Sequence, residues 1–281
     1  MKVIGLGDCV VDKYLHLNKM FPGGNALNFS VYSKKLGIDT VAYMGILGTD
    51  EIADHITKTL RKFEIDISKC KYRDGETGYA EVNLIDGDRK FVGSSKGVLF
   101  ESDFVLEKSD LEYLDKFDLI HSSCFSNLET QLDKLKKLNV PISFDFSRNI
   151  DIDYLKKVCP NIDYAFLSAS DLSVNETKKI LSTVVNLGCE FALATRGEDG
   201  AYLYLDSSYY HQKADKVEPI DTLGAGDSFI TSFLLDYISK DMTQEVIKKS
   251  LKKAAEFAAK TCLIYGAFGE EKEIKWGGFY V

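Results

Sequence analysis

Short apolar runs alternate with helical patterns through residues 118–240, and this alternation limits the fold more than any other feature. The apolar runs are Asp118 to Ser122, Pro141 to Phe146, Tyr164 to Ser168 and Glu190 to Thr195. Helical patterns lie between them, around 127–138, 151–158 and 172–187. This order is typical of a parallel sheet with helices on both faces. We therefore predict an α/β fold whose binding sites gather at the carboxyl ends of the strands.

The stretch Asp221 to Phe229 reads D-T-L-G-A-G-D-S-F and opens a helix, because apolar residues recur from Phe229 at helical spacing. Gly224, Ala225 and Gly226 are small and allow a ligand to approach the backbone closely. The N–H groups of a first helical turn favour an anion. We predict an anion cradle, with Asp227 as an ionised carboxylate that accepts a proton from an attacking hydroxyl. For a lone G-A-G the simpler interpretation is a turn and a helix cap.

Two acidic residues and a glycine pair lie near the N-terminus. Asp8 and Asp12 follow the apolar strand Lys2 to Gly7, where a carboxylate either accepts sugar hydroxyls or lies in a solvated turn. Farther on, the chain reads P-G-G-N-A-L-N. A helix N-cap explains Asn25 completely but does not require both Gly23 and Gly24.

Residues 79–84 alternate polar and apolar side chains, Asp86-Gly87 is a strong hairpin signal, and Arg89 to Val92 returns. Such a hairpin serves either as a lid over a site or as a plain sheet edge.

Further candidates lie where the other predicted strands end. They are Asp145 and Arg148 in F-D-F-S-R, Ser168 and Asp171 in S-A-S-D, and Thr195, Gly197 and Gly200 in T-R-G-E-D-G. A tight turn explains each glycine equally well. Ala255 belongs to an alanine cluster on a helix from about Gln244 to Ile264, where helix packing alone accounts for small residues.

Bulk composition restricts the class of protein. The length of 281 residues predicts a single domain, 1–281, and the net charge of −8 argues against a nucleic-acid partner. No apolar run reaches about 18 residues, so no membrane span is expected. The six cysteines form no C-x-x-C pair and the histidines show no metal-ligand spacing. We expect free thiols, no signal peptide and a cytoplasmic location.

The strings D-T-x-G-A-G-D and G-G-N-A-x-N resemble the motifs of ribokinase-like (PfkB-type) carbohydrate kinases, and the similarity extends over roughly residues 2 to 268. It implies a three-layer α/β/α sandwich with a mostly parallel central sheet. It also implies a small β lid from about 12–17 and 76–98, and it leaves 270–281 as a tail. ATP, Mg²⁺ and a monovalent cation such as K⁺ are the cofactors expected.

The same resemblance assigns roles to residues. Asp227 becomes the catalytic base, and Gly224, Ala225 and Gly226 form the anion hole. The substrate contacts are Asp12, Gly23, Gly24, Asn25 and Asn28, with Asp8 as a weaker candidate. The nucleotide contacts are Thr195, Gly197, Gly200 and Ala255. Asp221, near the loop Gly266-Ala267, is the expected ligand of the monovalent cation. Many members have N-x-x-E where this chain has Ser168 and Asp171, so Asp171 is the candidate for contacting Mg²⁺ through water.

Within that family the chain is most similar to bacterial fructosamine kinases, on G-D-C-V-V-D, D-R-K-F-V-G and F-D-F-S besides the two motifs. This implies phosphorylation of the 6-hydroxyl of a sugar linked to an amino acid, such as fructoselysine. Ribokinases carry Lys where this chain has Asn25, which disfavours ribose.

Several alternatives stay open. Fructose, 2-keto-3-deoxygluconate, ribose or a nucleoside could be the acceptor. A hexose phosphate ranks lower, because Arg89 and Lys90 are the only obvious lid cations. A sugar sensor without activity would be expected to lose the Asp227 cradle. A homodimer through the exposed edge of the lid is also expected.

Overall fold

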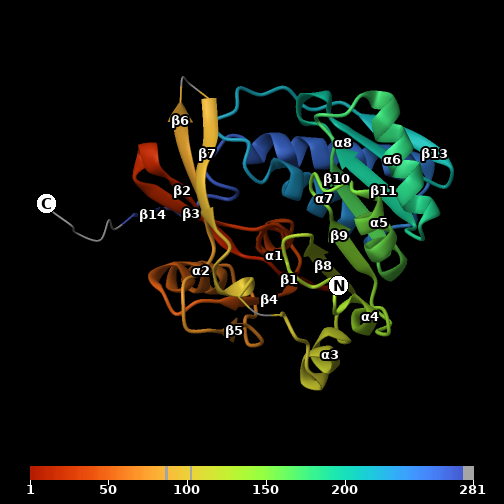
Figure 1. The fold of residues 1–281 in the computed structure, drawn as a ribbon. Helices are drawn as coiled ribbons and strands as arrows, with labels where there is room; N and C mark the ends of the chain where they lie inside the picture. The colour runs from red at the N-terminus through yellow and green to blue at the C-terminus, as the bar shows by residue number, and fades with distance from the viewer. Residues whose placement is uncertain (86–87, 102, 275–281) are drawn as a thin grey trace, which may run out of the picture.

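The computed structural model describes residues 1–85, 88–101 and 103–274, and divides them between two β-sheets flanked by helices (Figure 1). Within this part of the chain the larger sheet has nine strands in the order β13-β12-β11-β10-β9-β8-β1-β4-β5. They are β1 (Lys2–Gly7), β4 (Thr40–Leu47), β5 (Lys71–Tyr72), β8 (Leu119–Ser123), β9 (Ile142–Asp145), β10 (Tyr164–Ser168), β11 (Phe191–Thr195), β12 (Ala201–Leu205) and β13 (Ser208–Gln212). The strands from β11 to β5 pair in parallel, and β12 and β13 extend the sheet antiparallel. The predicted mostly parallel sheet is confirmed.

Helices cover both faces of this sheet, because neighbouring strand residues point to opposite sides. Val3 belongs to one buried cluster and Ile4 to the other. The first cluster lies under α1 (Asn25–Lys35), α2 (Glu51–Lys62), α7 (Ala225–Ser239) and α8 (Gln244–Thr261). The second lies under α3 (Lys108–Leu114), α4 (Leu132–Leu135), α5 (Ile152–Val158) and α6 (Val174–Asn186). Short 3-10 helices are η1 (Leu15–Leu17), η2 (Gly97–Leu99), η3 (Cys159–Asn161) and η4 (Gly197–Asp199).

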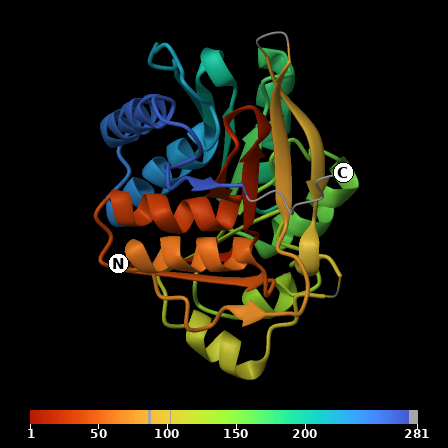
Figure 2. The same ribbon diagram turned by 90° about the vertical axis from the view of Figure 1, so that its left-hand side faces the viewer.

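A smaller sheet stands beside the large one and is seen side-on in Figure 2. Its strand order is β14-β3-β2-β6-β7. The strands are β2 (Val10–Tyr14), β3 (Lys19–Gly23), β6 (Tyr79–Ile85), β7 (Asp88–Ser95) and β14 (Lys272–Glu273). The predicted hairpin is present as β6 and β7, while its Asp86-Gly87 turn and the side chains of Arg89 and Lys90 lie outside the described residues. Strands β3 and β14 were not anticipated, and β14 attaches the start of the tail to this sheet.

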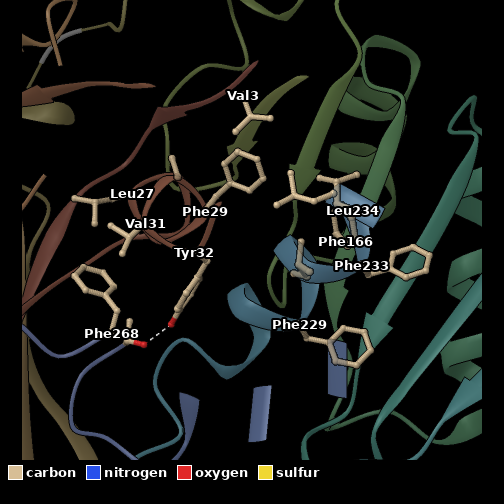
Figure 3. Close-up of a cluster of buried hydrophobic side chains, with 14 of the residues drawn as sticks. Val3, Leu27, Phe29, Val31, Tyr32, Phe166, Phe229, Phe233, Leu234 and Phe268 are labelled. Atoms are coloured by element: carbon tan, nitrogen blue, oxygen red, sulfur yellow. Dashed lines mark hydrogen bonds between the residues drawn. The ribbon is translucent and has the colours of Figure 1, made fainter. Parts of the chain in front are cut away.

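Helices α1 and α7 contribute side chains to the same buried cluster. Phe29, Val31 and Tyr32 of α1 lie in the same buried cluster as Phe229 and Phe233 of α7 (Figure 3). Burial of large aromatic side chains between two helices fixes their relative position.

One helix prediction was wrong in extent. A helix was expected over 127–138, but only Leu132–Leu135 is α-helical. Asn127 has a φ of +53° and donates a side-chain hydrogen bond to the Leu99 carbonyl at 3.3 Å. The residues before α4 therefore form a loop that contacts the chain following β7.

Candidate active site

Helix α7 begins at Ala225, directly after Gly224, whose φ of +73° lies in the left-handed region. A Cβ on Gly224 would lie 2.3 Å from the Tyr32 hydroxyl oxygen and 2.7 Å from the Ala267 Cβ. Tyr32 itself donates a hydrogen bond to the Ala267 carbonyl (Figure 3). Only glycine suits this backbone and this close contact, so Gly224 determines how the first turn of α7 faces the site.

The first turn of α7 faces open space beside the end of β11. A Cβ on Gly226 would have a single neighbour within 4 Å, the Thr195 Oγ1 at 3.9 Å. The first N–H groups of a helix have no acceptor within the helix, and they attract anions. Backbone amides and the Thr195 hydroxyl are thus close enough to contact one ligand together.

Asp227, also in this first turn, is held by two asparagines of α1. Asn28 Nδ2 donates to Asp227 Oδ2 at 2.6 Å, and Asn25 Nδ2 lies 3.2 Å from Asp227 Oδ1. Asn25 Nδ2 also donates to Asp145 Oδ2 at 2.6 Å. One amide group therefore joins the carboxylates of Asp145 and Asp227.

This grouping of carboxylates controls their protonation. Burial and the charge of Asp145 raise the pKa of Asp227 to about 8, against the lowering effect of its hydrogen bond from Asn28. Burial raises the pKa of Asp145 to about 6, although hydrogen bonds from Ser147 and Asn25 oppose the shift. The prediction that Asp227 stays ionised is wrong for the protein without ligands, because burial and neighbouring carboxylates outweigh the helix N-terminus.

Asp8 is committed to contacts within the protein. Its carboxylate accepts hydrogen bonds from the N–H groups of Asn25 at 2.6 Å and Ala26 at 3.3 Å, so it caps α1. The hydroxyls of Ser123 and Ser126 donate to its Oδ1 at 2.7 and 2.9 Å. These four donors fill the acceptor capacity of an ionised carboxylate. Asp8 thus orients the end of α1 that carries Asn25.

Asp12 explains one of the two glycines before α1. It is buried in the middle of β2, and a Cβ on Gly23 would lie 2.6 Å from its Oδ2. Gly24 has a φ of +109°, and a side chain there would contact the Asp8 carbonyl oxygen and the Cys9 Cα, each at 2.9 Å. Both glycines keep the backbone close to acidic side chains.

The nucleotide candidates are divided in space. Thr195 lies beside Gly226, and the following loop is held by buried Arg196, which donates to Thr177 Oγ1 at 2.7 Å. Gly200 makes the turn into β12, since a Cβ there would lie 1.9 Å from the Gln212 carbonyl oxygen. Gly197 has a φ of +57° and open space around its Cα. Ala255 of α8 is buried in the core, away from solvent.

The two metal candidates differ in their surroundings. Asp171 is exposed, and its Oδ2 lies 3.1 Å from an Arg148 guanidinium nitrogen. Asp221 is buried; its carboxylate accepts hydrogen bonds from the Tyr14 hydroxyl and from the N–H groups of Leu223 and Gly266 at 3.0 and 2.9 Å. Among residues 1–85, 88–101 and 103–274, no group of three or more His, Cys, Asp or Glu side chains is arranged to hold a metal ion by itself.

Local sequence patterns do not single out Ser123 or Ser126, and they mark Asp145 only as the end of a predicted strand. Ser123 and Asp145 end β8 and β9, so strand ends were the available signal, and Asp145 was noted on that ground. Ser126 contacts Asp8 across 118 residues of chain, and no local pattern marks it.

No lysine or arginine in the described ranges forms an ion pair with Asp8, Asp145 or Asp227. The site therefore combines an anion-binding helix end with carboxylates that lack a cationic partner. Elsewhere in these ranges, no helix has both the length and the apolar character that a bilayer span needs.

Comparison with known proteins shows which family this chain belongs to. Residues 9–270 match the model of the pfkB family carbohydrate kinases. The chain is 43% identical over 272 residues to fructosamine kinase FrlD of Bacillus subtilis, covering 96% of this chain and 93% of that one. It is 32% identical to fructoselysine 6-kinase of Escherichia coli, covering 94% of this chain and 98% of that one.

The fold is shared with a solved structure of Arabidopsis thaliana ribokinase complexed with ribose and ATP. The TM-score is 0.81 at 18% identity, with 96% of this chain and 95% of that chain covered. The ribokinase-like fold expected from the two motifs is thereby confirmed. The chain belongs to the pfkB family of carbohydrate kinases and is an ATP-dependent sugar kinase.

Proposed function

We propose that this kinase transfers the γ-phosphoryl group of ATP to the 6-hydroxyl of a fructosamine such as fructoselysine. The similarity to the Bacillus subtilis fructosamine kinase carries the proposal, since it extends over nearly the whole of both chains. The Escherichia coli fructoselysine 6-kinase supports the same substrate class at lower identity.

The charge of the site supports a cationic acceptor. Asp145 and Asp227 have raised pKa values, because burial and the charges of neighbouring carboxylates disfavour their ionised forms. A fructosamine carries a protonated secondary amine, whose positive charge suits a site rich in carboxylates. A hexose phosphate or a keto-deoxy acid adds negative charge, which such a site disfavours.

Asp227 is our candidate for the catalytic base. The sugar 6-hydroxyl gives its proton to an Asp227 oxygen while its oxygen atom attacks the γ-phosphorus in line. The bond from the γ-phosphorus to the bridging oxygen breaks, and ADP leaves with that electron pair. The N–H groups at Gly224, Ala225 and Gly226 stabilise the negative charge of the transferring group.

The remaining contacts to the sugar come from α1 and the small sheet. Asn25 and Asn28 orient Asp227, and the Oδ1 of Asn28 is buried without a hydrogen-bond partner among the described residues. This acceptor suits a sugar hydroxyl. We also assign substrate contacts to Asp12, Gly23 and Gly24, while Asp8 acts as a positioning residue for Asn25.

We assign ATP to the region beside the first turn of α7, where β11 ends at Thr195 and the turn after it contains Gly197 and Gly200, with Ala255 of α8 in the core. Mg²⁺ neutralises phosphate oxygens when bound and is held mainly by phosphates and water. Asp171 is the candidate for a contact through water, in place of its exposed ion pair with Arg148. Asp221 is the candidate ligand of K⁺. Replacing K⁺ with a large organic cation in the assay should lower the rate, and an unchanged rate would remove this assignment.

We also propose that the small sheet covers the sugar as a lid and forms a homodimer contact. Strand β7 is at the edge of that sheet, where its unpaired backbone groups are available to a second copy. A solution mass equal to one chain at micromolar concentration would contradict the dimer.

An ADP-release assay over a panel of acceptors tests the substrate. The panel holds fructoselysine, fructose, ribose, 2-keto-3-deoxygluconate, fructose 6-phosphate and adenosine. We expect fructoselysine to exceed every other acceptor by roughly tenfold or more in kcat/KM. If another acceptor leads, the fructosamine assignment fails while the kinase chemistry stands.

The variant Asp227→Ala tests the mechanism in the same assay. We expect kcat to fall roughly 10²–10⁴-fold with little change in sugar affinity measured by calorimetry, because the lost proton acceptor acts mainly in the transition state. An unchanged kcat would remove Asp227 from the role of base.

A further inference from the structure

We infer that the loops following β7 and β8 form an outer subsite for the amino-acid part of the acceptor. In this subsite Phe125 contacts the aliphatic chain and Lys96 binds the α-carboxylate. The inference rests on the proposed fructosamine substrate and adds the residues that would select it over a plain sugar.

The loop after β8 presents an aromatic ring next to the sugar end of the site. Ser123 and Ser126 are both turned toward Asp8, at 2.7 and 2.9 Å from its Oδ1. The Phe125 N–H also contacts Ser123 Oγ at 3.1 Å, so the backbone is fixed on both sides of this residue. Phe125 nevertheless remains 48% exposed. An aromatic ring on a loop held by these hydrogen bonds can pack against the methylene groups of a ligand.

The loop after β7 presents a cation beside a second exposed ring. Val98 and Leu99 of η2 are buried, while Lys96 and Phe100 on either side are exposed. Lys96 Nζ lies 4.4 Å from the centroid of the Phe100 ring, which restricts its position. Lys96 forms no ion pair with any described residue, so its charge is available.

The two loops are joined, and the loop after β7 lies near the start of the strand that carries Asp12. Asn127 Nδ2 donates to the Leu99 carbonyl at 3.3 Å. A Cβ on Gly78 would lie 3.1 Å from the Lys96 carbonyl oxygen and 3.2 Å from Val10 Cγ1. Val10 opens β2, two residues before Asp12. Both loops therefore lie at the base of the small sheet, next to the acidic site.

The chemistry of a fructosamine directs its tail to these loops. Its 6-hydroxyl must reach Asp227, so carbon 1, which bears the amine, lies at the opposite end of the sugar. Thr195 and the nucleotide side occupy β11, whereas Phe125 follows β8 beside β1 in the strand order. The tail thus leaves the site on the side of β8, with methylene groups to meet Phe125 and a carboxylate to meet Lys96.

Two acceptors that differ only in the tail separate these contacts. One is fructoselysine, and the other is the fructosamine of butylamine, which keeps a four-carbon chain but lacks both the α-carboxylate and the α-ammonium group. For Lys96→Gln we expect kcat/KM to fall roughly three- to tenfold on fructoselysine and to stay unchanged on the butylamine conjugate. Lys96→Arg should restore most of the loss. For Phe125→Ala we expect a loss of roughly tenfold on both conjugates and none on fructose.

Matched controls are Lys248→Gln and Tyr72→Ala, an exposed lysine on α8 and an exposed aromatic residue on β5. Neither should change discrimination between the two conjugates. Suppose that wild-type enzyme favours fructoselysine. If Lys96→Gln then lowers kcat/KM equally on both conjugates, or if Phe125→Ala changes kcat/KM on neither conjugate, the subsite is overturned and the fructosamine assignment stands. If wild-type enzyme turns over neither conjugate but accepts another sugar, both proposals fail.

Discussion

At the scale of single residues, the site depends on two buried carboxylates that share two amide hydrogen-bond donors. Asn25 contacts Asp145 and Asp227 with one amide group, and Asn28 contacts Asp227 with another. Two amides do not replace the water that these carboxylates lose on burial, so the protein without ligands holds Asp227 protonated at neutral pH. Binding of cationic groups is then coupled to release of a proton.

A pH profile of kcat/KM should report this coupling. With a pKa of about 8 for Asp227, kcat/KM should rise about tenfold per pH unit below that value and level off above it. Asp145→Asn removes the nearby charge that raises this pKa, so the rising limb should move to lower pH. Asp153→Asn, an exposed carboxylate on α5, should leave the limb in place. A limb that is identical in Asp145→Asn and wild type would contradict the coupling.

At the scale of elements, the site is the meeting of two helix N-termini on one core. Helix α1 is capped by Asp8, a residue of another segment, and α7 starts at a glycine pressed against Tyr32. Phe29 of α1 and Phe233 of α7 belong to one buried cluster, and the two helices are anchored in that common core (Figure 3). The distance between Asn28 and Asp227 is therefore a property of helix packing.

Gly224→Ala tests the role of the α7 start. The alanine backbone must adopt a φ near +73°, and its Cβ would lie too close to the Tyr32 hydroxyl. We therefore expect the free energy of unfolding to fall by about 1–3 kcal/mol. Displacement of the first turn should also lower kcat more than roughly tenfold.

Gly37→Ala is the matched control for Gly224→Ala. Its φ of +88° carries a similar backbone cost, but a Cβ there meets no atom within 4 Å. Denaturant unfolding and kcat, measured on both variants, separate backbone strain from the close contact. Equal stability losses with normal kcat in both would show that the contact with Tyr32 does not position α7.

At the scale of the whole molecule, local patterns predicted the large sheet and its helices well. Strand Tyr164–Ser168 matched its apolar run, and α6 begins at a capping box of Ser173 and Glu176 that its sequence encodes. What could not be predicted depends on distant contacts. Strand β14 has two residues and exists only because it pairs with β3. Two sets of site contacts are of this kind: Asp8 with Ser126, and Asn25 with both Asp145 and Asp227. They form only when segments far apart in the sequence come together in the folded protein.

The same carboxylates make the stability of the entire fold depend on pH. Asp227 has a folded pKa of about 8, above its ordinary value, so its stabilising contribution is complete at low pH and is lost as pH rises toward about 8. In Asp227→Asn the side chain cannot ionise, so this loss of stability with rising pH disappears. We expect the melting temperature of the variant minus that of wild type to increase by roughly 4 °C or more between pH 5 and pH 9.

Asp236→Asn provides a control of opposite sign. Ion pairs with Lys240 and Lys253, at 2.7 and 2.8 Å, lower the pKa of Asp236. Its contribution is present above its unfolded pKa and is lost as pH falls, so this variant should melt below wild type at both pH 5 and pH 9. If the melting temperature of Asp227→Asn exceeds that of wild type by no more at pH 9 than at pH 5, Asp227 is already ionised in the free protein. The acceptor would then bind to a charged site, and the coupling between substrate charge and proton release would have to be abandoned.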